Sequence, residues 1–199
     1  FENLAYGYTS LPNPDLGPET SESWEGGIKF STEAVSLQLA AFTADYDDFI
    51  SQQVVGGSFT PMDPAQYQFV NYDAVAIDGV EAKANFRMGN GFYSRFAIAY
   101  ADGDILSPGQ APAPLDTIDP LNLVLGIGYR EPQGRFGGEL IATHHARKPL
   151  DETDGGYRPD AFTILDATAF FAVTDALKLR AGIFNIFDEN YAYWQDVRG

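Results

Sequence analysis

The chain has 199 residues, 45% of them hydrophobic and 20% charged, and it lacks the run of about 18 apolar residues that a membrane-spanning helix needs. Its 12 basic and 28 acidic residues give a net charge of −16, which excludes nucleic acid as a natural partner. The sequence contains no cysteine, so disulfides, thiolate metal sites and cysteine nucleophiles are excluded. A high aromatic content, 14%, and 20 glycines favour β structure.

Apolar and polar residues alternate with a period of two along most of the chain. Residues 79–88 show the pattern most clearly, with apolar side chains on one parity and Glu81, Lys83 and Arg87 on the other. This alternation predicts strands with two chemically different faces. We predict eight strands, at residues 20–30, 34–46, 69–88, 91–101, 119–131, 135–147, 161–173 and 177–186.

The connections between these strands alternate between short and long. Their approximate lengths in chain order are three, 22, two, 17, three, 13 and three residues. Outer-membrane β-barrels have short periplasmic turns and long extracellular loops, so this order favours an antiparallel transmembrane β-barrel. In a soluble β-sandwich, nothing requires all the tight turns to lie at one end.

The charged residues inside the predicted strands lie on the parity opposite the bulky apolar residues. An Arg or Lys that faces lipid at mid-bilayer would cost about 2–4 kcal/mol, so the charged parity should face the lumen and the apolar parity the lipid. The long connections, taken with the tail 187–199, carry thirteen acidic residues against Lys148, Arg158 and Arg198. The extracellular surface is therefore expected to be acidic. The predicted lumen-facing charges are Glu25, Lys29, Glu81, Lys83, Arg87, Arg95, Arg130, Glu139, Asp166, Lys178 and Arg180.

We expect residues 1–199 to form one part of a larger transmembrane β-barrel domain. With short turns in the periplasm, both chain ends would lie at the extracellular end of an eight-stranded unit. Small single-chain barrels normally place both ends in the periplasm. Eight strands with open edges would instead pair with strands outside this sequence.

Four stretches carry a resemblance to a known family. Residues 13–21 (NPDLGPETS) resemble the NPNL-x-PE-T/S segment of TonB-dependent outer-membrane receptors, especially those for haem and haemoglobin. Residues 69–81 resemble the N…A-x-I-x-G-V-E strand of these receptors, and residues 182–191 (GIFNIFDENY) resemble their NLFD-x-x-Y signature. The tail 191–199 is similar to the loop that follows in haem receptors. The resemblance implies a 22-stranded barrel, of which these strands would be about 14 to 21, with the N-terminal plug and the final strand outside this chain.

The same resemblance implies energised import of an iron compound through the outer membrane of a Gram-negative bacterium. The transported ligand would be haem, including haem taken from host haemoproteins, or alternatively a ferric siderophore. The implied partners are outer-membrane lipid and the TonB complex, reached through the plug, and no intrinsic cofactor is implied. Haem receptors of this type place an axial histidine just before the NPNL segment, but residues 1–12 contain none.

The candidate ligand-binding residues follow from this comparison. Tyr6 and Tyr8 lie in the loop before the motif, where a phenolate can ligate ferric iron or an aromatic ring can simply line the base of a loop. His144 and His145 are the only histidines, and neighbours on a strand face opposite sides. We expect His145 to face the lumen and His144 the lipid headgroups. The full candidate set is Tyr6, Tyr8, Asn13, Pro14, Asp15, Leu16 and His145.

Other functional classes have less support. The sequence has no recognisable nucleophile, base and orienting group, so we do not expect an enzyme. The acidic runs at residues 45–48 and 102–104 lack the spacing of a calcium loop, and we interpret them as solvated charge. A soluble, secreted, acidic β-sandwich that binds glycans through Trp24, Tyr93 or Trp194 is the alternative from another class. That alternative predicts purification without detergent.

Overall fold

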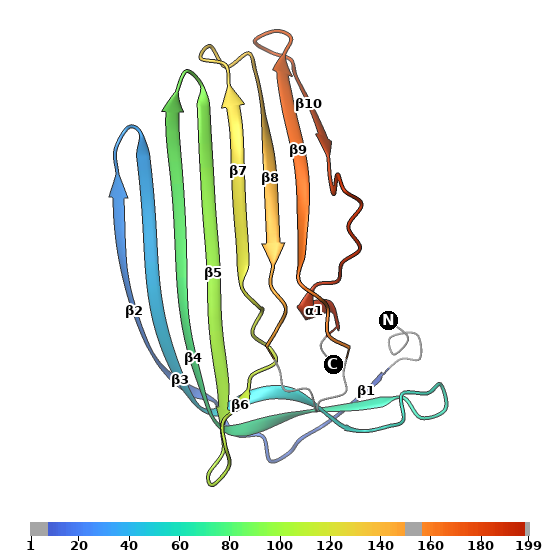
Figure 1. Cartoon of the computed structure of the whole chain (residues 1–199). Helices are drawn as coiled ribbons and strands as arrows, with labels where there is room; N and C mark the ends of the chain where they lie inside the picture. The colour runs from blue at the N-terminus through green and yellow to red at the C-terminus, as the bar shows by residue number, and fades with distance from the viewer. Residues whose placement is uncertain (1–7, 150–156, 198–199) are drawn as a thin grey trace.

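The structure is a computed structural model that describes residues 8–149 and 157–197, which form one curved, open sheet (Figure 1). No helix in these two ranges is long and apolar enough to cross a membrane. The elements are β1 (Tyr8–Leu11), β2 (Thr20–Ser31), β3 (Val35–Gly56), β4 (Ala65–Gly89), β5 (Phe92–Leu106), β6 (Ala113–Pro114), β7 (Asn122–Arg130), β8 (Phe136–His145), β9 (Phe162–Ala172), β10 (Lys178–Ile183) and α1 (Trp194–Val197).

Eight of the strands form an antiparallel wall in the order β10-β9-β8-β7-β5-β4-β3-β2. These are the eight strands that the sequence predicted. All the tight turns lie at the upper end in Figure 1, and the long connections lie at the lower end. Among the described residues, β2 and β10 each have a neighbour on one side only, as expected for part of a barrel.

The register places the apolar side chains of all eight strands on one face. One row of directly opposed residues runs through Phe30, Leu37, Ala84, Phe96 and Leu125 and continues across β8 and β9. The eleven strand charges predicted to face the lumen all lie on the opposite parity. Because directly opposed residues share a face, the sheet has one apolar face and one polar face.

No second layer of described residues covers the apolar face. Ile28 is 69% exposed, and Ile127 and Leu140 are each 53% exposed. Soluble monomers rarely expose an apolar surface that spans a whole sheet, so this face fits lipid and contradicts the soluble sandwich. Among the described residues, the buried apolar side chains lie toward the long connections: Ala44, Ala65, Val75, Leu115, Phe162, Ile164 and Trp194.

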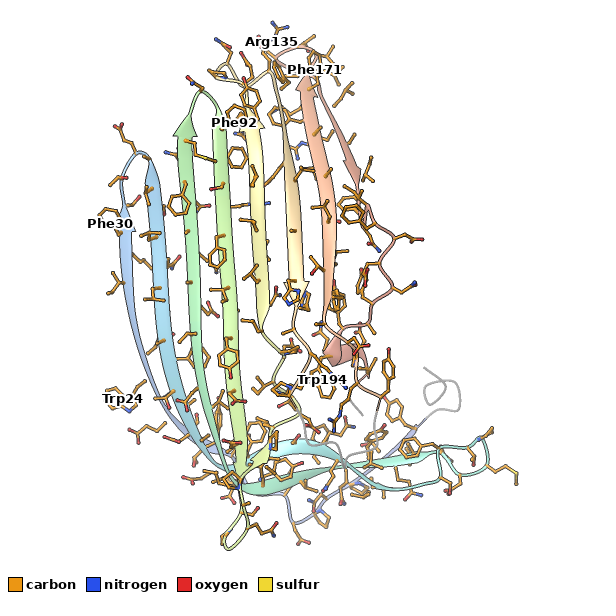
Figure 2. The ribbon with its side chains drawn as sticks, in the orientation of Figure 1. Trp24, Phe30, Phe92, Arg135, Phe171 and Trp194 are labelled. Carbon is orange, nitrogen blue, oxygen red and sulfur yellow. The ribbon has the colours of Figure 1, made fainter. Side chains whose placement is uncertain are left out.

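Aromatic residues border the apolar face near both ends, as membrane barrels require. Trp24 and Phe30 on β2 mark its two ends, six residues apart, which corresponds to about 20 Å of strand (Figure 2). At the turn end, the rings of Phe92 and Tyr129 lie 5.0 Å apart between centroids, and those of Tyr129 and Phe136 5.9 Å apart. The polar face is therefore the lumen side, and the turn end is the periplasmic end.

The sequence prediction was wrong about the connection at residues 47–68. Most of this segment continues β3 and β4 as a paired hairpin, and only residues 57–64 connect the two strands. Similarly, β5 continues to Leu106, and β1 and β6 were not predicted. Asp48 has a φ of 55°, in the left-handed region. The hairpin beyond it turns across the long-connection end of the wall (Figure 1), where it can shape a site at the mouth of the lumen.

Candidate ligand-binding site at the mouth of the lumen

The NPDLGPE segment between β1 and β2 fastens the bent hairpin. The amide of Asn71, on β4, accepts a hydrogen bond from the Gly17 nitrogen at 2.8 Å and donates to the carbonyl oxygens of Gly17 at 3.2 Å and Asp48 at 2.6 Å. One side chain therefore joins the segment to both strands of the hairpin at the point where it bends.

Further contacts continue this attachment on both strands of the hairpin. The Asn13 amide donates to the Phe69 carbonyl oxygen at 2.9 Å, and the Ile50 nitrogen donates to a Glu19 carboxylate oxygen at 2.8 Å. The Asn13 side-chain oxygen also accepts a hydrogen bond from the Asp15 nitrogen at 3.1 Å, which closes an Asx turn. The geometry explains why this short motif is rich in residues that favour turns and caps.

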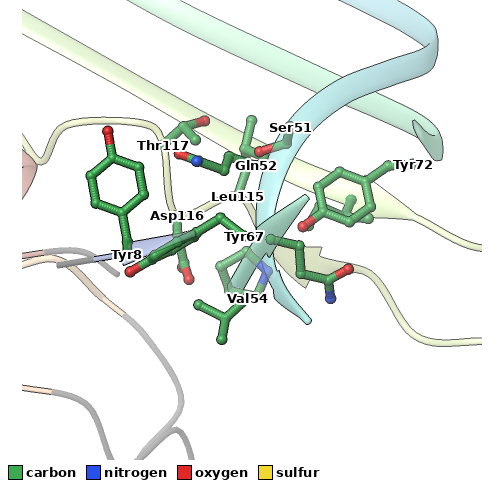
Figure 3. A pocket seen from close by; sticks show the side chains of 12 residues that line it. Tyr8, Ser51, Gln52, Val54, Tyr67, Tyr72, Leu115, Asp116 and Thr117 are labelled. Carbon is green, nitrogen blue, oxygen red and sulfur yellow. The ribbon is translucent and has the colours of Figure 1, made fainter. Parts of the chain in front are cut away.

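A cavity of about 730 Å³ lies between the hairpin, β1 and the segment that follows β6 (Figure 3). This size is within the range of small-molecule sites. Three tyrosines from two elements line the cavity: Tyr8 from β1, and Tyr67 and Tyr72 from β4. The Tyr8 and Tyr67 rings meet edge to face with centroids 5.9 Å apart. The remaining lining residues are Ser51, Gln52, Gln53, Val54, Ile105, Pro114, Leu115, Asp116 and Thr117.

The cavity offers hydrogen-bonding groups and little metal-ligating charge. Burial, and secondarily the nearby Asp116 carboxylate, raise the pKa of the Tyr72 hydroxyl above its ordinary value. The Tyr72 hydroxyl therefore stays protonated at physiological pH and can donate or accept a hydrogen bond. Among the described residues, no group of three or more His, Cys, Asp or Glu side chains is arranged to hold a metal ion.

The segment after β6 folds back over the polar face and forms one wall of the cavity. The Leu115 nitrogen donates to the Gly103 carbonyl oxygen at 2.7 Å, and the Leu115 side chain is only 1% exposed. A side chain at Gly103 would press against Leu115 and Ile118, so the glycine lets this segment lie close to β5. The indole of Trp194 donates to the Asp116 carbonyl oxygen at 2.6 Å, which ties the C-terminal tail to the same segment.

A cluster of aromatic rings lies beside this junction on the polar face. The His145 ring stacks on Phe162 with centroids 4.9 Å apart, and the Tyr193 ring meets His145 edge to face at 5.1 Å. The Tyr191 ring stacks on Phe162 with centroids 4.7 Å apart and meets the Tyr193 ring edge to face at 5.3 Å. Burial, followed by the neighbouring Tyr191, raises the pKa of the Tyr193 hydroxyl, so this phenol is also neutral.

Comparison with known proteins identifies the architecture. A family model described as "TonB dependent receptor-like, beta-barrel" matches residues 1–186. The chain belongs to the TonB-dependent receptor family. It forms part of the receptor barrel, which lies in the outer membrane of Gram-negative bacteria.

Curated relatives resemble the chain over nearly its whole length. A probable hemoglobin and hemoglobin-haptoglobin-binding protein of Haemophilus influenzae is 26% identical over 96% of the chain. Hemoglobin-haptoglobin utilization protein B of Neisseria meningitidis is 24% identical over 94% of it. The chain spans only 22% of the first relative and 27% of the second, so it corresponds to about a quarter of such receptors.

Solved structures of other proteins share the fold of the wall. Copper transporter OprC superposes with a TM-score of 0.80 at 21% identity, covering 90% of this chain and 27% of that protein. The siderophore receptor PirA of Pseudomonas aeruginosa gives a TM-score of 0.66 at 20% identity, covering 91% and 29%. At these identities the structures support the barrel fold and leave the transported ligand open.

Within this receptor barrel, the predicted site residues separate into three groups. Tyr8 lines the cavity, whereas residues 13–16 form the fastening turn and do not line it. His145 belongs to the aromatic cluster on the lumen face, and His144 lies on the apolar face, where its Nδ1 contacts the Thr163 hydroxyl at 2.9 Å. The two histidines thus face opposite sides of the sheet, which confirms the prediction that His145 faces the lumen and His144 the lipid side. Tyr6 lies outside the described residues, and ligand binding by the whole set stays a prediction.

Sequence reasoning missed most of the residues that complete the site. Tyr67 lies in the part of the hairpin that was predicted to be a loop, so no strand pattern pointed to it. Tyr72 lies in the strand predicted at residues 69–88, but outside the clear alternation at residues 79–88. Tyr191 and Tyr193 belong to the tail whose resemblance to haem receptors was noted. Their high aromatic density, next to Trp194, was the available signal. Phe162 begins β9 directly opposite His145.

Proposed function

We propose that the complete protein is a TonB-dependent outer-membrane transporter that imports haem, including haem taken from host haemoproteins. In this proposal outer-membrane lipid surrounds the apolar face, and the TonB complex acts through a plug that lies outside this chain. The haem is cargo, and the barrel carries no resident cofactor.

The observation that carries this proposal is the position of His145. Its imidazole lies on the lumen face at the end of β8 nearest the mouth, within a cluster formed by Phe162, Tyr191 and Tyr193. Flat aromatic rings offer stacking surfaces for a porphyrin, and a histidine nitrogen is a common axial ligand of haem iron. The hydroxyl groups of Tyr191 and Tyr193 can donate hydrogen bonds to carboxylates at the porphyrin edge.

Two further facts support haem as the ligand class. Curated relatives that match nearly the whole chain are named as hemoglobin-binding or hemoglobin-haptoglobin-binding proteins. The cavity of about 730 Å³ beside the aromatic cluster adds room for a ligand of drug-like size or larger. The segment at residues 114–117 lines the cavity and accepts a hydrogen bond from Trp194, the chain neighbour of Tyr193 in the cluster, so one bound ligand can engage both parts of the mouth.

Titration of the full-length protein in detergent with ferric haem tests this proposal. We expect a saturable Soret shift, and His145→Ala should weaken binding about tenfold or more because an axial ligand is lost. His144→Ala is the matched control, since the neighbouring imidazole lies on the apolar face. Equal binding by both variants would remove His145 from the site. No specific Soret shift in the wild type would overturn haem as the ligand.

A ferric siderophore is the second candidate, and the tyrosine-lined cavity favours it. Tyr8, Tyr67 and Tyr72, with Gln52 and Gln53, present hydroxyl and amide groups that suit the oxygen-rich surface of a chelate. Structures of siderophore receptors such as PirA share the fold. Uptake of a ferric siderophore by cells, together with no specific Soret response of the purified receptor, would decide for this class. Under that outcome Tyr8→Phe should reduce uptake and Tyr100→Phe, on the apolar face, should not.

A further inference from the structure

A buried polar atom at the mouth of the lumen has no hydrogen-bond partner among the described residues. It is the side-chain oxygen Oδ1 of Asn122, the first residue of β7. β7 is an interior strand of the wall, between β5 and β8 (Figure 1). Because atoms of this chain already bury the oxygen, neither the plug nor the strands outside this chain could supply a partner without displacing them. The partner should therefore come from the neighbours of Asn122 in the wall.

His145 is the directly opposed neighbour that can donate a hydrogen bond to this oxygen. Asn122 and His145 pair across β7 and β8 on the lumen face, whereas the opposing residue on β5 is Ala99, which has no polar side chain. The Ala146 nitrogen donates to the Leu121 carbonyl oxygen at 2.9 Å, so the next pair, Asn122 and His145, exchanges no backbone hydrogen bonds. Side chains of such pairs lie close, with Cβ atoms about 4.5–5.5 Å apart. An amide oxygen at Asn122 is then within reach of the imidazole.

Aromatic contacts fix the plane of the His145 ring but not the direction in which each nitrogen points. The ring stacks on Phe162 and meets Tyr193 edge to face. A half-turn of the imidazole about its bond to Cβ leaves the same plane against Phe162 and exchanges the positions of nitrogen and carbon atoms. Stacking therefore cannot select one orientation or one tautomer, whereas a hydrogen bond to one nitrogen can.

Asn122 is a better acceptor for this purpose than the nearest carboxylate. Asp119 acts on His145 electrostatically, but Asp119 is exposed, so water can solvate its charge. The Asn122 oxygen is buried and depends on a donor from the protein. Nδ1 is the ring nitrogen closer to Cβ, and it is therefore the one closer to a cross-strand neighbour. The geometry favours a hydrogen bond from Nδ1–H to the Asn122 oxygen.

We propose that Asn122 is a positioning residue for His145: its side-chain oxygen accepts a hydrogen bond from Nδ1–H, which leaves the Nε2 lone pair facing the lumen. The inference deepens the proposed function and rests on it in one respect, because it takes this lone pair to be the one that coordinates haem iron. Histidine ligands commonly donate their second N–H to an acceptor, which fixes the tautomer and makes the imidazole a stronger ligand. Asn122 acts only through His145.

The tautomer of His145 in the haem-free receptor tests this contact directly. Solid-state NMR of the full-length protein, labelled with isotopic histidine and reconstituted in bilayers, distinguishes the two tautomers by their ring nitrogen signals. The signals of His145 are those that disappear in H145Q. We expect Nδ1–H in the wild type and the Nε2–H form, which free imidazole side chains prefer in water, in Asn122→Leu. D119N should keep the Nδ1–H form.

Titration of the full-length protein in detergent with ferric haem measures the consequence for binding. Asn122→Leu should weaken binding about fivefold, and N122D, which keeps an acceptor, less than twofold. In an H145A background, Asn122→Leu should add no further loss, because the two residues act as one unit. Asn85→Leu makes the same substitution on the lumen face of β4 and is the matched control, with binding equal to wild type. Heat-modifiable migration on gels checks that each variant keeps a folded barrel.

The outcomes distinguish this inference from the haem proposal. An Nδ1–H tautomer that depends on Asn122 supports the positioning role, and if the same protein shows no Soret shift, haem alone is overturned. A normal Soret shift together with Nε2–H in the wild type, or with the same tautomer in wild type and Asn122→Leu, overturns the positioning role alone. A tautomer that changes in D119N and not in Asn122→Leu also overturns it, because the carboxylate would then hold the ring.

Discussion

At the scale of single residues, Asn71 shows how the mouth of the lumen is held in shape. Its amide contacts backbone groups of Gly17 and Asp48, which are 54 and 23 positions away in the sequence. Asp48 adopts a left-handed backbone conformation, which is uncommon for residues other than glycine and needs support from its surroundings. The hydrogen bond from Asn71 to the Asp48 carbonyl oxygen supplies part of that support.

We predict that Asn71→Ala loosens the hairpin without unfolding the wall. The substitution leaves partly buried backbone groups without a partner, which costs about 1–3 kcal/mol locally. Hydrogen exchange measured by mass spectrometry on the full-length protein should show faster exchange, by about tenfold, in peptides covering residues 49–70. Asn85→Ala, on the same strand but inside the wall, is the control. Unchanged exchange in the hairpin would refute the fastening role of Asn71.

Some residue positions followed from the sequence and others did not. The opposite orientations of His144 and His145 required only the period of two in a strand. The role of Asn71 depends on which distant segments meet at the bend, and alternation carries no information about that. The same limit applies to Tyr8 and Tyr67, whose rings meet because β1 pairs in parallel with β4.

At the scale of elements, β7 illustrates how the wall divides its two environments. Leu123, Leu125 and Ile127 lie on the apolar face, while Val124 and Gly126 lie on the lumen face. Leu125 belongs to the apolar row that crosses most of the sheet. The adjacent Val124 belongs to the row that contains Lys83 and Thr143.

We predict that Leu125→Lys destabilises the barrel and that Val124→Lys has a much smaller effect. A lysine at the lipid-facing position should cost about 2–4 kcal/mol near the bilayer midplane, whereas at the lumen-facing position it meets water. Urea-dependent folding of the full-length protein into lipid bilayers measures both variants. Equal destabilisation would mean that the assignment of the two faces is incorrect.

The membrane-spanning parts of the strands were predictable because each face meets a different environment. Beyond Asp47 on β3 and before Ala74 on β4, both faces of the hairpin are outside the lipid, so no alternation is imposed on the sequence. Residues 51–56 (SQQVVG) show this loss of pattern, yet all of them except Val55, which lies at a register shift, pair with β4. The hairpin forms strands because the hydrogen bonds between β3 and β4 in the wall continue into it. The same reasoning applies to the outer part of β5, which pairs with the short strand β6.

At the scale of the whole molecule, the acidic excess marks the outer limit of the lipid-facing band. Asp78 and Asp102 face each other directly across β4 and β5, two residues beyond the pair of Val80 and Tyr100 on the same face. Like charges in direct opposition are unfavourable and require strong solvation. The boundary between lipid and the outer aqueous layer therefore lies between these two rows. The hairpin and the site at the mouth lie on the outer side of this boundary.

This orientation predicts which parts of the chain are accessible from outside the cell. Met62, in the connection at the tip of the hairpin, is 97% exposed, and Gln133 lies in the tight turn between β7 and β8 at the other end. The chain has no cysteine of its own, so each position can carry a single reporter thiol within this part of the receptor. A membrane-impermeant maleimide added to intact cells should label Met62→Cys and leave Gln133→Cys unlabelled. Both variants should react after the cells are lysed, and the receptor without the added cysteine gives the background. Labelling of Gln133→Cys on intact cells, with Met62→Cys protected, would invert the barrel and place the tyrosine cavity on the periplasmic side.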